Sequence, residues 1–318
     1  MQSIDRAPLR SRRRLRLPIG TMPDGSTLSI AVNVITGTAR RPRLVAVAGH
    51  HGDEHEGPAA LITLWQQLQP DAMRGSLVMV PVLNPAAFQA IRRTSYEDQL
   101  DMNRIFPGSP SGTVTERLAH AFCNQMLPGA DLILSMHGWS AGYVVEPYLE
   151  YPRSGDMSEK SRLAGAAFGV PFLNALDAGP GRLLTVASGM RVPIIEVEIG
   201  GQATSQPDRR ALYEAGIRNL LRHLGIIAGR PRRTVAPQVI EQAQVFAAAG
   251  GMLRAETTVG SIVRRGQVLA TIFDLNLQPI ATVTSPAGGV LGVVRLAASV
   301  LPGQLVAAIF TKVESQHG

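Results

Sequence analysis

Cysteine is almost absent from this 318-residue chain, since Cys123 is the only one, and an internal disulfide is therefore excluded. The fold thus does not depend on an oxidising compartment. The chain also lacks any apolar run of the roughly 18 residues that cross a bilayer. Its basic N-terminal segment is not followed by the apolar stretch of a signal peptide. We therefore expect a cytoplasmic protein with no membrane partner.

Lysine is scarce as well. Lys160 and Lys312 are the only two, so arginine supplies nearly all the positive charge behind the formal net charge of +7. Arginines cluster between residues 10 and 16, and such a cluster can attract nucleic acid or a membrane surface. No aromatic residues interleave this cluster, and no nucleic-acid-binding motif follows it. We interpret the segment as a frayed, solvated arm and expect no nucleic-acid partner.

An apolar strand at residues 44–48 leads directly into the turn Gly49-His50-His51-Gly52-Asp53-Glu54. Short apolar runs of this kind are typical of buried parallel strands, and open α/β sheets bind ligands at the carboxyl ends of such strands. Catalytic zinc is typically held by two histidines and one carboxylate, with water in the fourth position. His51 and Glu54 are candidates for two of these three ligands.

The third ligand should lie at the end of another strand of the sheet. Residues 131–136 form such a strand, and His137 follows it at once. His50 and His55 flank the first motif and remain alternatives. The other histidines lie in predicted helices or near the C-terminal end.

Four segments occur in an order that resembles a known family. They are the turn at residues 49–54, the segment Asp101-Met102-Asn103-Arg104-Ile105-Phe106-Pro107-Gly108, His137, and Glu198-Ile199-Gly200-Gly201. From about residue 25 to 310 the chain resembles the succinylglutamate desuccinylase/aspartoacylase family, a branch of the zinc carboxypeptidase fold. The element Asn-Arg-x-Phe-Pro-Gly is the most specific part of this resemblance.

The resemblance implies a role for each matching residue. The residues that would bind one zinc ion per chain are His51, Glu54 and His137. The residues that would line the substrate pocket are Arg93, Asn103 and Arg104. Glu198 would be the general base. Ser135 departs from the family pattern, because many deacylases have aspartate two residues before the last histidine, and serine there is closer to the carboxypeptidases.

Two carboxylates compete for the role of base. Glu196 and Glu198 lie two residues apart on a predicted strand, so their side chains point to the same face. A base that takes a proton from water and passes it to the leaving nitrogen contributes about 10²- to 10⁴-fold in rate. We prefer Glu198 because it adjoins the glycine pair at the strand end and matches the family position.

Arginines also occur in residues 91–112, a segment without regular periodicity that we predict to be a long functional loop. Arg93 and Arg104, together with Asn103, form a patch rich in hydrogen-bond donors. Guanidinium groups pair bidentately with carboxylates. The patch therefore predicts a substrate with a free carboxylate.

The chain changes character after the basic linker at residues 229–233. Residues 263–273 and 300–310 share a pattern of Val, Gly-Gln and Ile-Phe at matching positions, which indicates two half-units of a small β domain. This domain, at residues 234–318, resembles the biotinyl/lipoyl-type barrel that the family also carries. Carrier proteins attach their cofactor to a lysine between the halves, and residues 274–289 contain none. We therefore predict a structural or substrate-shaping role for it.

Strands alternate with helices over residues 28–224, which predicts a mostly parallel, mixed α/β sheet flanked by helices in a catalytic domain of residues 1–228. The leading hypothesis is a zinc-dependent amidohydrolase that removes an acyl group from a small N-acyl amino acid. The alternative is a zinc carboxypeptidase that acts on short peptides. A non-catalytic metal-binding scaffold is a third hypothesis. The expected partner is a small molecule, and a homo-oligomer is left open.

Overall fold

The computed structural model describes residues 2–22, 24–233 and 235–313. The strands in its first part are β1 (Ser11–Thr21), β2 (Thr27–Thr36), β3 (Arg43–Val47), β4 (Ser76–Val80), β5 (Leu132–His137), β6 (Tyr143–Pro152), β7 (Phe172–Leu176) and β8 (Ile194–Gly201). The helices are α1 (Gln2–Asp5), α2 (Glu56–Gln67), α3 (Pro85–Ala90), α4 (Val114–Met126), α5 (Ser158–Phe168), α6 (Leu183–Gly189) and α7 (Pro207–His223). Short 3-10 helices occupy Pro70–Ala72 and Met102–Arg104.

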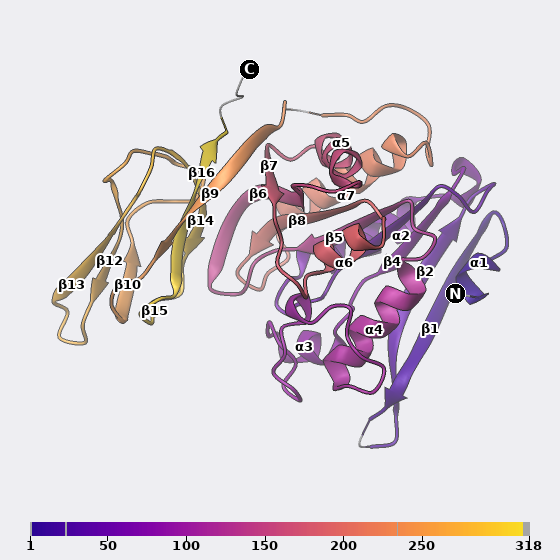
Figure 1. Cartoon of the computed structure of the whole chain (residues 1–318), viewed down its shortest axis with the longest axis horizontal. Coiled ribbons are helices and arrows are strands. Elements are labelled where there is room, and N and C mark those ends of the chain that lie inside the picture. The colour runs from indigo at the N-terminus through magenta and orange to yellow at the C-terminus, as the bar shows by residue number, and fades with distance from the viewer. Residues whose placement is uncertain (1, 23, 234, 314–318) are drawn as a thin grey trace.

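The C-terminal part consists of strands. They are β9 (Gln238–Phe246), β10 (Gly251–Ala255), β11 (Ile262–Val263), β12 (Val268–Phe273), β13 (Pro279–Thr284), β14 (Gly289–Arg295), β15 (Ser299–Val300) and β16 (Leu305–Lys312). Figure 1 shows them as a separate group of arrows beside the larger helix-containing part.

A twelve-stranded mixed sheet runs through the molecule in the order β1-β2-β4-β3-β5-β8-β6-β7-β9-β16-β14-β11. Its centre, β4-β3-β5-β8, is parallel, as the alternation of strands and helices predicts. The strands on either side are largely antiparallel, beginning with β1–β2–β4 and β8–β6. The predicted α/β fold with a mixed sheet is thus confirmed, and parallel pairing occurs in two blocks, β4-β3-β5-β8 and β6-β7-β9.

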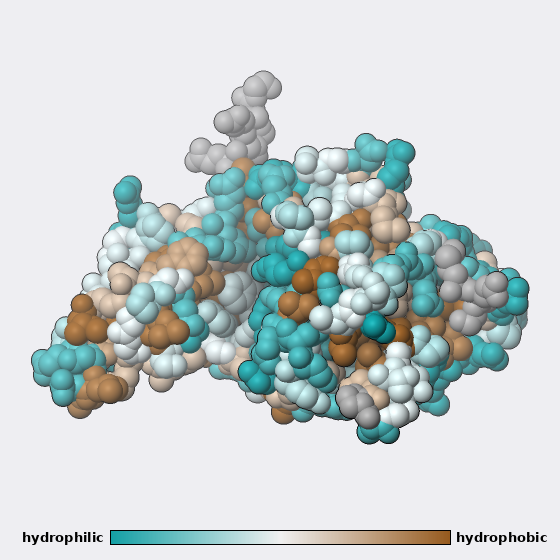
Figure 2. Space-filling view, turned by 60° about the horizontal axis from the view of Figure 1, so that its bottom comes forward, coloured by the Kyte–Doolittle hydropathy of each residue, from teal (hydrophilic) through white to brown (hydrophobic). Residues whose placement is uncertain are grey.

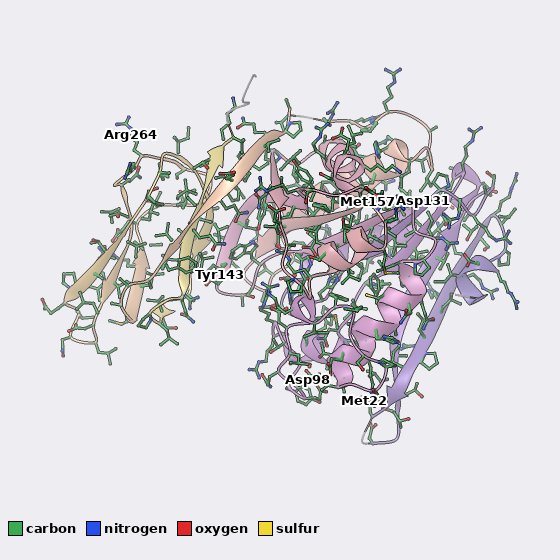
Figure 3. The ribbon with its side chains drawn as sticks, in the orientation of Figure 1. Met22, Asp98, Asp131, Tyr143, Met157 and Arg264 are labelled. Atoms are coloured by element: carbon green, nitrogen blue, oxygen red, sulfur yellow. The ribbon has the colours of Figure 1, made fainter. Side chains whose placement is uncertain are left out.

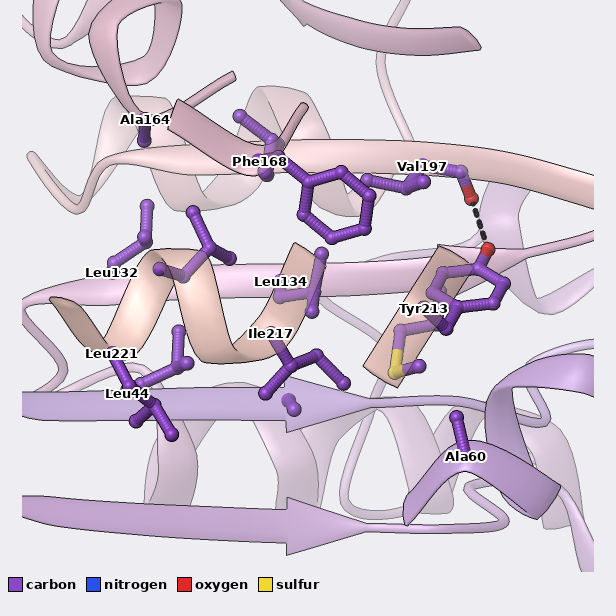
Figure 4. Close-up of a cluster of buried hydrophobic side chains, with 14 of the residues drawn as sticks. Leu44, Ala60, Leu132, Leu134, Ala164, Phe168, Val197, Tyr213, Ile217 and Leu221 are labelled. Atoms are coloured by element: carbon purple, nitrogen blue, oxygen red, sulfur yellow. Dashed lines mark hydrogen bonds between the residues drawn. The ribbon is translucent and has the colours of Figure 1, made fainter. Parts of the chain in front are cut away.

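Helices cover both faces of this central region. Leu44 and Ala46 of β3 belong to a buried cluster with α2, α5 and α7, whereas Val45 and Val47 belong to another with α4 and α6. This alternation is the period of two that a strand buried on both faces requires. In Figure 4, Tyr213 of α7 lies in the first cluster, and its hydroxyl donates a hydrogen bond to the Val197 carbonyl oxygen at 2.8 Å.

The N-terminal arginine cluster is not the frayed arm that its charge suggested. It lies in β1, which pairs with β2 along its whole length. Leu15 and Leu17 alternate with the arginines and pack into the second cluster, so the strand has one apolar face. Arg12 and Arg14 lie over the Trp65 ring, at 5.6 and 5.2 Å from its centroid. The interpretation as a solvated arm was wrong because this alternation outweighs the charge.

The C-terminal strands form two packed layers, β9-β16-β14-β11 and β13-β12-β10-β15, but their backbone pairings do not close into a ring without help from the first part. The pairings β6–β7, β7–β9, β9–β16, β16–β14 and β14–β6 form a closed ring of five strands. The buried cluster that this ring encloses includes Tyr148, Phe172, Ile240, Val293 and Phe310, one from each strand. The predicted barrel-like closure is therefore present in part, but it uses β6 and β7 of the first part. The predicted boundary between residues 228 and 234 stays a prediction.

A second sheet, in the order β13-β12-β10-β15, packs against the C-terminal strands of the first sheet. The cluster between the two sheets includes Leu253, Ile272 and Val306. Figure 3 places Tyr143, at the start of β6, between the two parts of the molecule. Figure 2 shows apolar residues gathered at the far end of the C-terminal strands. Leu275 and Leu277, in the turn between β12 and β13, are exposed. None of the described helices is long and apolar enough to cross a membrane.

Candidate active site

The register of the sheet aligns residues from three strands in one row. His137 of β5 lies opposite Glu198 of β8, and Glu198 lies opposite Tyr148 of β6. The turn after β3 brings His51 and Glu54 to the same place. This is the carboxyl edge of the parallel strands, where α/β sheets bind their ligands.

The turn that carries His51 and Glu54 packs closely on α3. A Cβ atom at Gly52 would collide with the backbone carbonyl of Ala87, so glycine is required there. Both functional side chains of the turn are buried. The backbone therefore holds them rigidly below the surface.

His51, Glu54 and His137 form a buried cluster whose potential ligand atoms all lie within 4.8 Å of one another. The Nδ1 atoms of His51 and His137 lie 2.7 and 3.0 Å from the two carboxylate oxygens of Glu54. Both Nε2 atoms are held from outside, by Asp101 Oδ1 at 3.0 Å on His51 and by Ser135 Oγ at 3.0 Å on His137. Such outer contacts fix the rings of metal-binding histidines. The cluster therefore has the ligand types and the orientation to hold a divalent metal ion.

Electrostatics favour an ionised carboxylate in this cluster. Burial alone would raise the pKa of Glu54, but His51 and His137 hold it well below its usual range. Burial alone would lower the pKa of His51, but Glu54 raises it above its ordinary value. A negative charge is thus maintained where a cation would bind.

The two alternative histidines lie outside the cluster. The ring of His50 stacks on that of His137, with 4.7 Å between centroids, and burial lowers its pKa well below its usual value. His55 Nε2 lies 3.0 Å from the carbonyl oxygen of Gly52. The geometry therefore favours His51 as the ligand from this turn.

The two candidate bases differ in their surroundings. Glu198 lines the pocket, and its Oε2 has no hydrogen-bond partner among the described residues. Burial first, and then the carboxylates of Glu54, Glu150 and Glu196, raise the pKa of Glu198 well above its usual value. Glu196 is fully buried, and its Oε2 accepts a hydrogen bond from Arg182 Nη2 at 2.6 Å. Of the two, Glu198 is the one whose side chain lines the pocket.

The predicted substrate loop also reaches the pocket, which Arg93, Asn103 and Arg104 all line. Arg93 donates two hydrogen bonds to Asp101 Oδ2, one from Nε at 3.0 Å and one from Nη2 at 2.9 Å. Asn103 Nδ2 donates to Glu196 Oε1 at 3.3 Å. Arg104 donates to the Asn103 carbonyl oxygen at 2.8 Å and forms no ion pair among the described residues. Arg104 is therefore the guanidinium with donors to spare for an anion, whereas Arg93 already holds a carboxylate.

The pocket encloses about 400 Å³, within the ordinary range for small-molecule sites. Several of its residues were not found from the sequence: Trp139, Ser140, Tyr143, Tyr148, Glu150, Arg182, Gln242, Gln244 and Leu305. The last three belong to β9 and β16, so the C-terminal part supplies one wall. Figure 2 shows the surface hollowed between the two parts, with hydrophilic residues along one side. Polar residues alternate along β6, and this pattern could have pointed to the pocket residues on that strand. No local motif marks the remaining pocket residues.

Comparison with known proteins agrees with this geometry. Residues 40–224 match the family model described as the succinylglutamate desuccinylase/aspartoacylase catalytic domain. The chain is 33% identical over 314 residues to the N-alpha-acetyl-L-2,4-diaminobutyric acid deacetylase of Halomonas elongata. The aligned region covers 95% of this chain and 91% of that protein. The chain belongs to the succinylglutamate desuccinylase/aspartoacylase family. The resemblance inferred from the sequence motifs is thus confirmed.

Solved structures share the fold over nearly the whole chain. The product-bound ectoine utilization protein EutE (DoeB) from Ruegeria pomeroyi has a TM-score of 0.89 at 27% identity, over 96% of this chain and 98% of that one. A succinylglutamate desuccinylase/aspartoacylase from Rhodobacter sphaeroides has a TM-score of 0.87 at 26% identity, over 95% and 96% of the two chains. The similarity therefore extends through the C-terminal strands as well as the catalytic region.

Proposed function

We propose that this protein is a zinc-dependent amidohydrolase that removes a small acyl group from an N-acyl amino acid. The observation that carries the proposal is the convergence of His51, Glu54 and His137 in one pocket with Glu198, whose Oε2 has no hydrogen-bond partner in the part of the chain that the structure describes. The relative from Halomonas elongata, named as a deacetylase of an N-acetylated amino acid, supports the reaction type.

Two imidazole nitrogens and one carboxylate are the ligand set of many catalytic zinc sites, which leave a position open for water. Bound zinc would polarise the scissile carbonyl and lower the pKa of a water molecule toward ~7. The chain itself provides the orientation of the ligands, through Asp101 and Ser135. With Nε2 engaged by these outer contacts, the Nδ1 atom of each ring is directed toward the carboxylate of Glu54.

Glu198 acts as the general base in this proposal. It takes a proton from the attacking water and delivers it to the nitrogen that leaves. A carboxylate of ordinary pKa is a weak base at neutral pH, so the raised pKa of Glu198 brings it closer to the value that proton transfer requires. The base lies opposite His137 in the register, beside the proposed metal position.

Arg104 binds the free carboxylate of the substrate amino acid. Its guanidinium lines the pocket and has no carboxylate partner among the described residues. Arg93 contributes by holding Asp101, which in turn contacts His51. Asn103, fixed between Glu196 and the backbone of Leu183, shapes the same wall.

The C-terminal part is a substrate-shaping element in this proposal. Gln242, Gln244 and Leu305 complete the wall that faces the substrate loop. A pocket of about 400 Å³ admits an acyl amino acid and restricts longer peptides.

Hydrolysis assays test the proposal directly. The zinc-loaded protein would be incubated with N-acetyl, N-succinyl and N-formyl amino acids and, in parallel, with dipeptides. We expect release of a free amino acid from at least one acyl series at a higher kcat/KM than from any dipeptide. Preferential cleavage of dipeptides would instead establish a carboxypeptidase.

A further inference from the structure

A row of polar side chains lies two residues along the strands from the row of His137 and Glu198, and we call it the floor because it reaches the pocket through Glu150. The register places Ser135 opposite Glu196, and Glu196 opposite Glu150. Glu150 in turn lies opposite Asn174. Acidic residues that face each other directly across two strands repel and destabilise a sheet. Packing alone gives no reason for this pair.

A single guanidinium is shared by the two carboxylates. Arg182 Nη2 donates to Glu150 Oε2 and to Glu196 Oε2, each at 2.6 Å. Asn174 and Asn103 donate one bond each, to Glu150 Oε1 and to Glu196 Oε1 at 3.3 Å, but bring no charge. Two carboxylates and one guanidinium leave this group with a formal charge of −1. A buried excess charge is costly unless a counter-charge meets it.

Glu150 is the member of the pair that a ligand can reach. Its side chain lines the pocket, whereas that of Glu196 is fully buried beneath Arg182 and Asn103. The acidic floor also affects its neighbour, because Glu150 and Glu196 are among the groups that, after burial and Glu54, raise the pKa of Glu198. The negative potential of the floor therefore extends into the space that a substrate occupies.

Another residue of the pocket lining carries the opposite charge. Arg104 extends from the substrate loop without a carboxylate partner among the described residues, while Arg182 on the floor is already shared by two. A ligand with a carboxylate at one end and a cationic group at the other would satisfy both charges. An N-acyl amino acid has such a form only when its side chain carries a cationic group, and an ammonium group is the most compact of these.

We propose that Glu150 binds the side-chain ammonium group of the substrate, so that the enzyme selects N-acyl amino acids whose side chain ends in a primary amine. Arg182 is then a positioning residue. It holds the Glu150 carboxylate and neutralises one of the two carboxylates, so that one negative charge remains for the ligand. The assignment rests on the proposed deacylase function. The relative from Halomonas elongata is named for a substrate of this kind, N-acetylated 2,4-diaminobutyric acid.

Selectivity among three matched substrates tests the assignment. They are Nα-acetyl-2,4-diaminobutyrate, its neutral isostere Nα-acetylnorvaline, and the anionic Nα-acetylaspartate, all assayed as kcat/KM with the zinc-loaded enzyme. We expect the cationic substrate to exceed the neutral one by about 10- to 100-fold, the range for a hydrogen bond to a charged group. The anionic substrate should be the poorest of the three, because it meets the negative floor.

Glu150→Gln should remove most of this selectivity. Its kcat/KM for the cationic substrate should fall by about 10- to 100-fold, with little change for acetylnorvaline. Glu146→Gln is the matched control, since Glu146 lies on the same strand but does not line the pocket, and it should keep the parental ratio. An equal fall for both substrates in Glu150→Gln would show a structural role only and overturn the assignment.

The parent enzyme alone gives a second test that does not depend on how the variant folds. Equal kcat/KM for acetylnorvaline and the diaminobutyrate derivative would overturn the role of Glu150 and leave the deacylase function intact. Hydrolysis of none of the N-acetyl amino acids would overturn the deacylase function, and this assignment with it.

Discussion

Glu196 and Glu198 lie two residues apart on β8, but only Glu196 shares the guanidinium of Arg182. The two carboxylates therefore have different chemistry despite their common strand face. Glu196 is fixed in an ion pair under the pocket, and Glu198 Oε2 is left without a hydrogen-bond partner among the described residues. This difference supplies what the sequence alone lacked, a physical reason to choose between them.

Glu198→Gln should separate the base from the metal ligands. The amide keeps the shape of the side chain but cannot accept a proton at neutral pH. We expect the variant to retain its zinc and to lose at least about a hundredfold in kcat. Glu196→Gln serves as the comparison and should lower stability more than it lowers catalysis. Strong loss of kcat in Glu196→Gln, with Glu198→Gln nearly active, would mean that the roles are reversed.

Arg104→Ala should weaken recognition of the substrate carboxylate. We expect kcat/KM to fall by roughly 10- to 100-fold for substrates with a free α-carboxylate, the range for a charged hydrogen-bond partner. Arg92→Ala is a matched control from the same loop, because Arg92 does not line the pocket. Substrates with an amidated carboxylate should be poor for the parent and should differ little between parent and Arg104→Ala. Good turnover of an amidated substrate by the parent would contradict a carboxylate-binding pocket.

That His51, Glu54, His137 and Glu198 would meet at one edge of the sheet could be predicted because their signals are local. Each lies near the carboxyl end of an apolar strand or in the turn after it, and the parallel register of β3, β5 and β8 brings these strand ends together. The capping box of Thr113 and Glu116 at the start of α4 has the same local character, since its spacing is a property of the helix itself.

The rest of the pocket depends on contacts between distant segments. Arg182 follows Glu150 by 32 residues, and only the pairing of β6 with β8 brings Glu150 beside Glu196. The wall from Gln242 depends on the closed ring of strands, which has no periodic signature of its own. Sequence periodicity identifies an element, but it does not state which elements will be neighbours.

Glu56 should make the stability of the protein depend on pH. Its side chain is buried, neither carboxylate oxygen has a hydrogen-bond partner among the described residues, and burial, followed by Glu54, raises its pKa to about 8. The unfolded value is about 4.3, so between that pH and 8 the folded state binds the extra proton. Stability from this group is therefore present at low pH and is lost as pH rises toward 8.

Glu56→Gln should flatten this dependence, because the amide stays neutral at every pH. Thermal unfolding of parent and variant, both zinc-loaded, would be compared at pH 5, 6, 7 and 8. The Tm of the parent should fall relative to that of the variant as pH rises. Parallel curves for the two proteins would show that Glu56 does not titrate in this range.

Removal of the C-terminal strands should damage the fold as well as the pocket. A chain that ends at Arg233 lacks β9, β14 and β16, so the ring opens and Tyr148 loses the cover of Phe310. The edges of β6 and β7 would be left unpaired, and exposed edges favour aggregation. We expect a lower Tm and reduced recovery of soluble monomer or oligomer in size-exclusion chromatography. A well-folded truncate with unchanged kcat/KM would contradict both the structural and the substrate-shaping role.

Intact-mass analysis of the full chain should show no biotin or lipoyl adduct.

The most direct measurement of the central claim is zinc content and deacylase activity on the same samples. Parent protein and His137→Ala would be stripped with a chelator, reconstituted with zinc, and analysed for metal per chain and for hydrolysis of an Nα-acetyl amino acid. We predict one zinc per parent chain, activity that returns in proportion to bound zinc, and sharp loss of both in His137→Ala. Full zinc occupancy in His137→Ala, or full activity in the stripped parent, would contradict the account.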